Sequence, residues 1–169
     1  MQKDFAALLG DMNMTKEDPT PKLIGRDKAV TSAMPDSLEV ALMAAHLAEE
    51  KKASDTVILD VREKCSYADF FVVTGAPSER QAQAVARNID DGLRRGGVKP
   101  MSTEGVRDGA WVLLDFGDVV VHCFYESARG YYDLEGFWSD APRLDLDEAK
   151  AIASLRKIGL DAHGAPLPQ

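Results

Sequence analysis

Two apolar segments joined by Gly117-Asp118 constrain the fold of this chain more than any other feature. Residues 111–116 (WVLLDF) and 119–124 (VVVHCF) have the composition of β-strands, and a two-residue Gly-Asp connection is typical of a tight hairpin. Side chains alternate between the two faces of a strand, and here both faces are mostly apolar. Such a pattern indicates strands that are covered on both sides. The sequence therefore predicts a sheet with packing partners on each face.

The remaining segments predict an α/β fold. Asp36 or Ser37 is expected to cap a first helix, and Ser78 with Gln81 has the sequence of a capping box at the start of a second helix. We expect strands at 56–61, 70–74, 98–102, 111–116 and 119–124, and helices at 37–52, 78–95, 126–138 and 145–158. The predicted fold class is α/β, with a mixed sheet of about five strands and flanking helices.

Length and composition favour a single domain with extensions. A chain of 169 residues with 45% hydrophobic content can bury one core. We expect a flexible extension at 1–35, the α/β domain at 36–143, and a C-terminal helix with a loose tail at 144–169. No apolar run approaches the roughly 18–20 residues of a membrane span, and the first residues do not have the pattern of a signal peptide.

Cysteine and histidine usage predicts neither a disulfide framework nor a metal site. Cys65 and Cys123 form no C-x-x-C pair and lie in strand-like runs, so they are expected to be buried thiols in a reducing cytoplasm. His46, His122 and His163 are far apart in sequence and do not have the spacing of metal ligands. We expect a cytoplasmic protein without a cofactor.

Charge is distributed unevenly along the chain. The net charge of −8 argues against general binding to nucleic-acid phosphates, including direct binding to DNA, and favours a basic protein partner. Residues 103–140 contain eight acidic residues and two arginines, so this segment carries −6 of the net charge. The same segment holds eight of the twelve aromatic residues. Acidic charge and aromatic side chains therefore coincide, as they would on a surface that binds a basic protein.

Catalytic motifs give little support to an enzyme. The sequence contains no G-x-S-x-G, no P-loop and no G-x-G-x-x-G, and His122 in an apolar strand is more typical of a core or interface histidine than of a general base. The stretch TGAPSER after a strand is similar to the phosphate-binding turn of nucleotidyltransferases. Those enzymes hold Mg²⁺ with two carboxylates that point the same way. Asp90 and Asp91 are adjacent on a predicted helix, and Asp115 and Asp118 fit turn roles instead.

The second face of the sheet has three possible partners. The predicted helices can cover one face, and the aromatic segment 126–138 could cover part of the other. A homodimer could also cover this face, and so could a different macromolecule. An apolar surface with an acidic rim is typical of an interaction site.

Two blocks of the sequence resemble a known family. The first is DFFVVTGAPSERQAQAVARNIDD followed by Glu104-Gly105, and the second is WVLLDFGDVVVHCFYESARGYYDLEGFWSDAP. The second block contains D-x-G-D-V-V-V-H and then R-x-x-Y-x-L-E-x-x-W, which begins at Arg129 and ends at Trp138. On these motifs, residues 38–143 resemble the ribosomal silencing factor family, also called RsfS or Iojap. The segment before residue 36 and the C-terminal helix depart from the simplest members.

The resemblance implies a nucleotidyltransferase-like fold that does not catalyse a reaction. It implies a protein that binds the large ribosomal subunit through the fourteenth protein of that subunit, on the face that meets the small subunit. Binding there would block association of the subunits and repress translation under nutrient limitation. The alternatives are a nucleotidyltransferase-type enzyme and a self-associating domain with no ribosomal role.

The predicted partner-binding residues combine apolar anchors with acidic neighbours. Leu134 and Phe137 are assigned to packing, and no catalytic or metal-binding residue is predicted. The predicted contact residues are Trp111, Leu113, Asp115, Val121, Tyr132, Glu135 and Trp138, with Glu104 and Asp108 at the rim.

Overall fold

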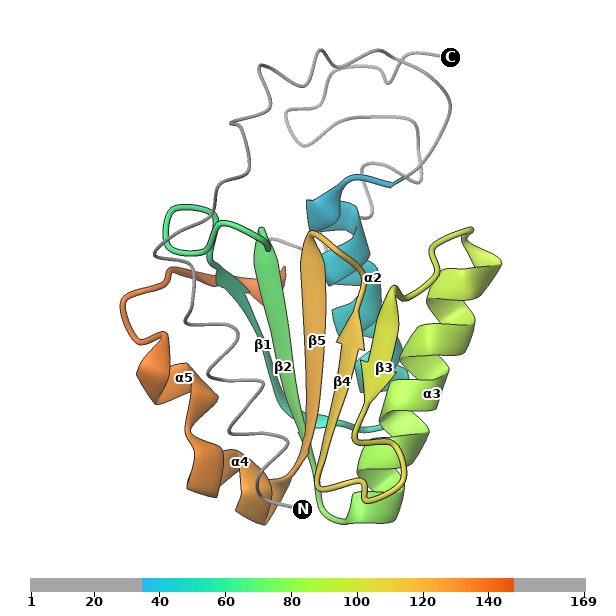
Figure 1. Cartoon of the computed structure of the whole chain (residues 1–169). Helices are drawn as coiled ribbons and strands as arrows, with labels where there is room; N and C mark the ends of the chain where they lie inside the picture. The colour runs from blue at the N-terminus through green and yellow to red at the C-terminus, as the bar shows by residue number, and fades with distance from the viewer. Residues whose placement is uncertain (1–34, 148–169) are drawn as a thin grey trace. The chain divides into compact units, whose positions relative to one another are not determined.

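A six-stranded mixed sheet organises the part of the chain that the computed structural model describes, residues 35–147. The strand order is β3-β4-β5-β2-β1-β6, and helices pack on both faces (Figure 1). The strands are β1 (Ser54–Asp60), β2 (Phe70–Ala76), β3 (Ser102–Glu104), β4 (Trp111–Asp115), β5 (Val119–Tyr125) and β6 (Arg143–Leu144). The helices are α2 (Ser37–Glu50), α3 (Glu79–Arg95), α4 (Glu126–Tyr132) and α5 (Leu134–Phe137).

The pairing of the strands confirms the predicted mixed α/β sheet. β2 and β5 are parallel and lie at the centre, whereas the other neighbouring strands are antiparallel. The sheet has one strand more than expected, because residues 143–144 pair with β1. The edge strand β3 begins at Ser102, where the predicted strand ends, because Pro100 cannot donate a ladder hydrogen bond.

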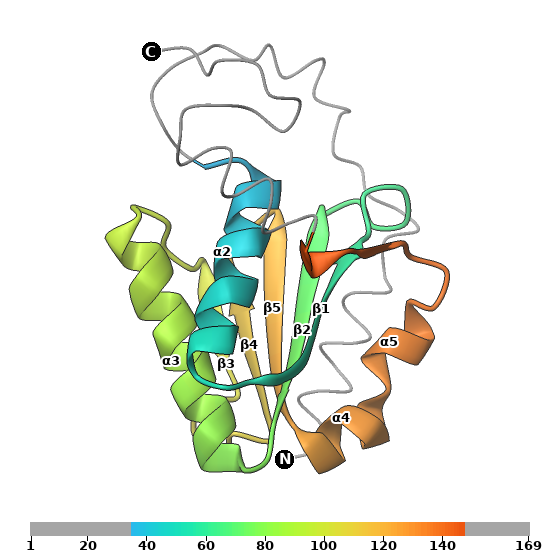
Figure 2. The same cartoon turned by 180° about the vertical axis from the view of Figure 1, so that it is seen from behind.

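Helices α2 and α3 cover one face of the sheet, which we call the helical face (Figure 2). Their apolar stripes pack on alternate residues of the central strands, and each large aliphatic side chain buried there stabilises the fold by about 1.5–3 kcal/mol. Gly92 lets the two helices approach closely, because a Cβ at this position would lie 2.5 Å from Leu47 Cδ2. The strand residues on this face include Ile58, Val72, Val112, Leu114, Val121 and Cys123.

Both long helices begin at the capping residues that the sequence indicates. The Asp36 carboxylate accepts a hydrogen bond from the Glu39 backbone N–H, and the Glu39 side chain accepts one from the Asp36 N–H, which completes a capping box. Ser78 Oγ accepts from the Gln81 N–H. The Gln81 amide does not complete the predicted box; it donates to the Lys51 carbonyl and ties α3 to the end of α2.

The predicted aromatic helix at 126–138 is broken into α4 and α5. Asp133 interrupts it with φ +44°, in the left-handed region that short polar side chains tolerate. The Asp133 carboxylate also accepts a hydrogen bond from the Gly136 N–H, so this residue starts α5 as well as ending α4. The break rotates the residues of α5 relative to those of α4.

Some predicted segments lie outside the described residues. Residues 146 and 147 are helical, which agrees with the start of the helix predicted at 145–158, and the rest of that helix lies beyond the described range. The extension predicted at 1–35 also lies outside it, except for Pro35. Between residues 35 and 147, no helix is long and apolar enough to cross a membrane.

Candidate partner-binding surface

The residues that point away from α2 and α3 form a second apolar face of the sheet. The β4–β5 register places Leu113 opposite His122, and the β2–β5 register places Phe71 beside Val120. All of these side chains are buried, which confirms that both faces of the strands are covered. We call this set the front face: Phe71, Val73, Trp111, Leu113, Val120, His122 and Phe124.

Arg129 attaches α4 and α5 to the edge of the sheet. Its Nε donates to Glu135 Oε2 over 2.8 Å, its Nη1 to the Ser54 carbonyl over 3.2 Å, and its Nη2 to the Asp55 carbonyl over 2.7 Å. All three guanidinium nitrogens therefore have acceptors, and the planar group holds three segments of the chain in fixed geometry. Glu135, a predicted contact residue, is committed to this internal pair.

Gly75 on β2 provides the space that this attachment requires. A Cβ at this position would lie 2.9 Å from Ser54 Oγ and 3.2 Å from Arg129 Nη1. A side chain at residue 75 would therefore displace the guanidinium from the strand carbonyls. The glycine in the TGAPSER stretch serves close packing of Arg129, which gives it a structural role distinct from the phosphate-binding turn that the sequence suggests.

Trp111 and His122 form a buried polar pair within the front face. Trp111 Nε1 donates to His122 Nδ1 over 3.1 Å, so the neutral imidazole carries its proton on Nε2. Burial lowers the pKa of His122 to about 3. The ring is therefore uncharged at neutral pH and serves as an acceptor inside the core. This agrees with the prediction of a core or interface histidine.

Phe71 connects this pair to α5. Its ring lies edge-to-face with His122 at 5.3 Å between centroids and with Trp138 at 5.2 Å. His122 Nε2 and Trp138 Nε1 are buried without a conventional hydrogen-bond partner. The front face is therefore an aromatic core layer, with Trp138 as one of its members.

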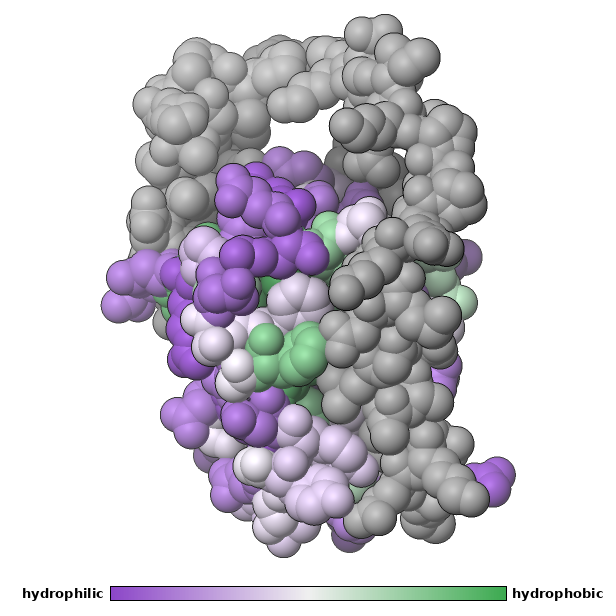
Figure 3. All heavy atoms as spheres, turned by 60° about the vertical axis from the view of Figure 1, so that its left-hand side comes forward, coloured by the Kyte–Doolittle hydropathy of each residue, from purple (hydrophilic) through white to green (hydrophobic). Residues whose placement is uncertain are grey.

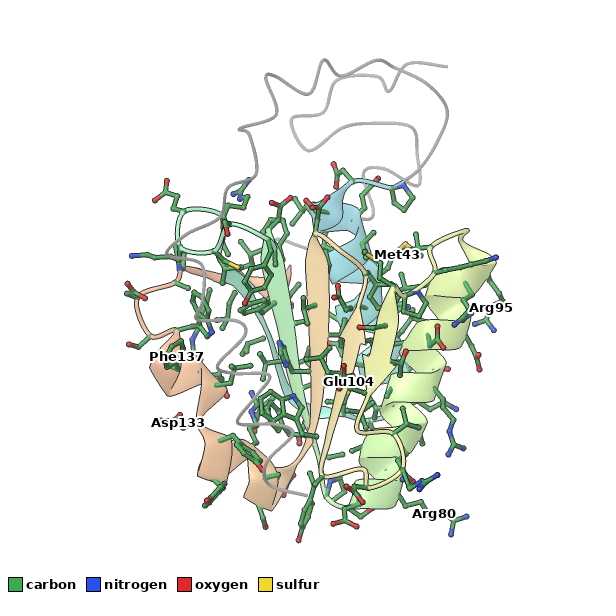
Figure 4. All side chains as sticks on the ribbon, in the orientation of Figure 1. Met43, Arg80, Arg95, Glu104, Asp133 and Phe137 are labelled. Carbon is green, nitrogen blue, oxygen red and sulfur yellow. The ribbon has the colours of Figure 1, made fainter. Side chains whose placement is uncertain are left out.

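The two short helices each carry one exposed aromatic side chain, Tyr131 on α4 and Phe137 on α5. Tyr131 is 70% exposed and Phe137 is 50% exposed, so both rings present apolar surface for a contact. Figure 3, turned toward this side, shows a small hydrophobic patch among hydrophilic residues, and Figure 4 shows Phe137 and Asp133 on the outer side of these helices. We define the α4–α5 surface as Tyr131 and Phe137 with the exposed acids Glu126, Asp133 and Asp140.

The apolar residues predicted to contact a partner are mostly buried. Trp111, Leu113 and Trp138 are 0%, 3% and 7% exposed, and all three belong to the front face or pack on it. Val121 is fully buried on the helical face, so the structure does not bring it together with the others. Tyr132 is partly exposed, and its ring centroid lies 5.0 Å from that of Trp111.

The acidic residues predicted for the same surface have different surroundings. Asp115 accepts a hydrogen bond from the Gly117 N–H over 2.8 Å and so shapes the hairpin turn, in agreement with the turn role that the sequence predicts for it. Glu104 is exposed on β3 and shares the front side of the sheet with Leu113 (Figure 4). Asp108 is partly exposed in the loop between β3 and β4.

The predicted contact residues do not include Tyr131, and Phe137 is assigned to packing instead. The assignment of Phe137 to packing is wrong, because half of its side chain is exposed. An uninterrupted helix over 126–138 would place residues by a constant 100° step, but the break at Asp133 resets that step. The sequence feature that indicates this break is Asp133, because aspartate tolerates the left-handed backbone region.

Two further observations concern ligand binding. Between residues 35 and 147, no group of three or more His, Cys, Asp or Glu side chains could hold a metal ion. An open polar pocket lies at the β1 edge, but its central arginine, Arg129, already donates to three acceptors of the fold. The strongest feature for recognition is therefore the α4–α5 surface.

The chain belongs to the ribosomal silencing factor family. The family model described as ribosomal silencing factor during starvation matches residues 34–160. The chain is 42% identical over 105 residues to the ribosomal silencing factor RsfS of Bacillus subtilis, an alignment that covers 62% of this chain and 89% of that protein. It is 33% identical over 111 residues to the chloroplastic protein Iojap of Arabidopsis thaliana, covering 66% of this chain and 46% of the plant protein.

Solved structures agree with this membership. A crystal structure of a Chromobacterium violaceum protein superposes with a TM-score of 0.61 at 34% sequence identity, over 62% of this chain and 88% of the other. A crystal structure of a Bacillus halodurans protein gives a TM-score of 0.57, also at 34% identity, over 63% and 97% of the two chains. The predicted family and the α/β fold class are thereby confirmed.

Proposed function

We propose that this protein binds the large ribosomal subunit at its fourteenth protein, on the face that meets the small subunit, and blocks association of the two subunits. It would thereby repress translation under nutrient limitation, acting in the cytoplasm by binding rather than by catalysis. The observation that carries the proposal is a pair of exposed aromatic rings on an acidic surface, in a chain of the ribosomal silencing factor family.

The α4–α5 surface has the composition of a protein-binding site. Exposed Tyr131 and Phe137 offer large rings with few rotatable bonds, and such residues supply most of the binding energy at many interfaces. Residues 126–140 contain four acids and one arginine, for a net charge of −3. Ribosomal proteins are typically basic, so charge complementarity would speed the encounter.

The predicted contact residues divide into two roles in this proposal. The exposed members, Glu104 and Asp108, would form the rim of the contact together with Asp133. The buried members, Trp111, Leu113 and Trp138, would support the α4–α5 surface from below. A rigid support matters because anchors that are already ordered lose less entropy on binding.

A nucleotidyltransferase-type reaction has less support. Asp90 forms an ion pair with Arg94 over 2.6 Å on α3, and Asp91 is exposed on the same helix. The two carboxylates do not form the converging pair that two-metal phosphoryl transfer requires.

Sucrose-gradient sedimentation tests the proposal. Purified protein is added to isolated large and small subunits under conditions that favour joining. We expect it to migrate with the large subunit and to reduce the peak of joined ribosomes, and to do so less at high salt, because screening weakens charge steering. The small subunit alone serves as the control. A protein that never migrates with the large subunit and leaves joining unchanged would refute the proposal.

A further inference from the structure

The lysines and arginines without an ion pair cluster on one side of the molecule. Among the twelve that the structure describes, Arg62, Lys64, Arg94, Arg129 and Arg143 form ion pairs with carboxylates. The other seven form none within the described part of the chain. They are Lys51, Lys52, Arg80, Arg87, Arg95, Lys99 and Arg107.

All seven lie on α3 or on segments bonded to it. Arg80, Arg87 and Arg95 are exposed on α3, and Lys99 follows its end. The Gln81 amide of α3 donates to the Lys51 carbonyl, which places Lys51 and Lys52 at the start of this helix. The Gln83 amide donates to the Arg107 carbonyl over 3.2 Å, which places the Arg107 backbone beside the same helix.

The arginines of α3 that form no ion pair with the described residues are exposed along the helix. Arg80 and Arg87 are seven residues apart, so they lie on nearly the same side, about 10 Å apart along the axis, and Arg95 lies eight residues further on, about 80° round the helix. Arg80 and Arg95 point away from the sheet in Figure 4. The acids on this helix are Glu79, Asp90, which pairs with Arg94, and Asp91. We call Arg80, Arg87 and Arg95 with Lys51, Lys52 and Lys99 the α3 basic stripe.

We propose that the α3 basic stripe binds the phosphodiester backbone of RNA while the α4–α5 surface holds a protein. Unpaired, exposed arginines spaced along a rigid helix suit a row of phosphates, because each guanidinium can donate two hydrogen bonds to one phosphate. This inference rests on the proposed function for its setting, since a large ribosomal subunit presents RNA next to basic proteins.

The stripe also revises a conclusion from composition. A net charge of −8 argues against phosphate binding only if the charge is spread evenly. Here α3 contacts β4 and β5 from the helical face, whereas the α4–α5 surface lies on the front side, so the two charged regions face different directions. The six cations of the stripe outnumber the four acids beside them in sequence, Glu49, Glu50, Glu79 and Asp91. Such a local excess of positive charge can bind a polyanion although the chain as a whole is acidic.

Filter binding to protein-free large-subunit ribosomal RNA tests the stripe directly. The variant Arg80→Gln/Arg87→Gln loses two charges of the stripe. The control Arg62→Gln/Lys64→Gln loses two charges that are already paired, after β1 at the opposite side of the sheet. We expect the stripe variant to bind about tenfold or more weakly, and the slope of log affinity against log salt to fall in magnitude by about 2. The control variant should bind like the wild type.

Cosedimentation with intact large subunits separates this inference from the proposed function. We expect the stripe variant to bind the isolated fourteenth protein as the wild type does, and to bind the whole subunit more weakly. Equal binding of both variants to the RNA, or no binding of the wild type to it, would overturn the stripe proposal and leave the proposed function intact. Loss of binding to the isolated protein as well would also overturn it, since the stripe would then contact protein. Failure of the wild type to bind the subunit would refute the proposed function itself.

Discussion

Helix α3 and the α4–α5 segment are both amphipathic, yet only the orientation of α3 could be predicted from the sequence. In α3, Ala82, Val85, Ile89 and Leu93 are buried as the helical period predicts. In α4–α5, Phe137 points outward and Trp138 inward, because the chain breaks at Asp133 and Arg129 fixes the two short helices to β1. Periodicity determines the orientation of a long helix, whereas contacts with the rest of the fold determine that of two short ones.

The two regions also differ in charge and in what their exposed side chains offer a partner. The α3 basic stripe presents exposed cations that form no ion pair with residues 35–147, while the α4–α5 surface presents two aromatic rings with three acids. If both proposals hold, the two regions would let one small domain contact a protein and an RNA at once. The substitutions below examine the two regions and the core that joins them.

The largest expected effect distinguishes the buried front face from the exposed rings. Trp111→Ala should lower the free energy of unfolding by about 3–5 kcal/mol, because the indole is fully buried and hydrogen-bonded to His122. Tyr131→Ala, which removes a 70% exposed ring, should change it by no more than about 0.5 kcal/mol. Chemical denaturation measures both. Equal losses in the two variants would contradict the division into support and contact surface.

Loss of the Arg129 attachment should have the next largest effect. Arg129→Ala removes the donor of two strand carbonyls and leaves the Glu135 carboxylate with only the more distant Arg143, and should destabilise the protein by about 2–3 kcal/mol. Arg143→Ala is the matched control, because that side chain is 58% exposed and lies 3.6 Å from the same carboxylate. Thermal unfolding compares them. If Arg143→Ala lowers the stability as much as Arg129→Ala does, the hydrogen bonds from Arg129 to the strand carbonyls do not stabilise the attachment.

The pH dependence of stability should reveal the buried histidine of the front face. The unfolded chain takes up a proton near pH 6.5, whereas the folded chain does so only near the lowered pKa of about 3. Stability should therefore fall as the pH decreases through this window, by about 2 kcal/mol between pH 7 and pH 5. His122→Asn should not show this decrease.

An NMR titration of the His122 ring gives an independent measurement on the wild type. The ring should stay neutral at pH 5, and protonation near pH 6.5 in the folded state would show that it is not buried as described.

A small effect is expected at the start of α3. Ser78→Ala removes the acceptor of the Gln81 N–H and should cost about 1 kcal/mol, measured by denaturant unfolding. Ser78→Asp should restore most of this loss, because an aspartate caps a helix equally well. If Ser78→Asp is no better than Ser78→Ala, the effect arises from something other than capping.

Much of the fold could be predicted from local patterns, and the site only in part. The hairpin turn at Gly117, the cap at Asp36 and the edge position of β3 follow from the residues themselves. β6 could not be predicted, since two residues gain strand pairing only from the neighbouring β1.

The candidate contact residues show the same limit. The sequence shows that aromatic rings and acids coincide, but burial depends on long-range packing. Val121 and Leu113 occupy opposite faces because the β4–β5 register pairs Leu113 with His122. When both faces of two strands are apolar, the sequence does not indicate which face the helices cover.

The central claim is that the α4–α5 surface blocks subunit joining, and light scattering of mixed large and small subunits tests it most directly. Wild-type protein should suppress the increase in scattering that joining produces. Tyr131→Ala/Phe137→Ala should remain folded, because both rings are at least half exposed, and should require a concentration at least about tenfold higher for the same suppression. A folded double variant that suppresses joining at the wild-type concentration would show that these exposed rings do not contact the ribosome.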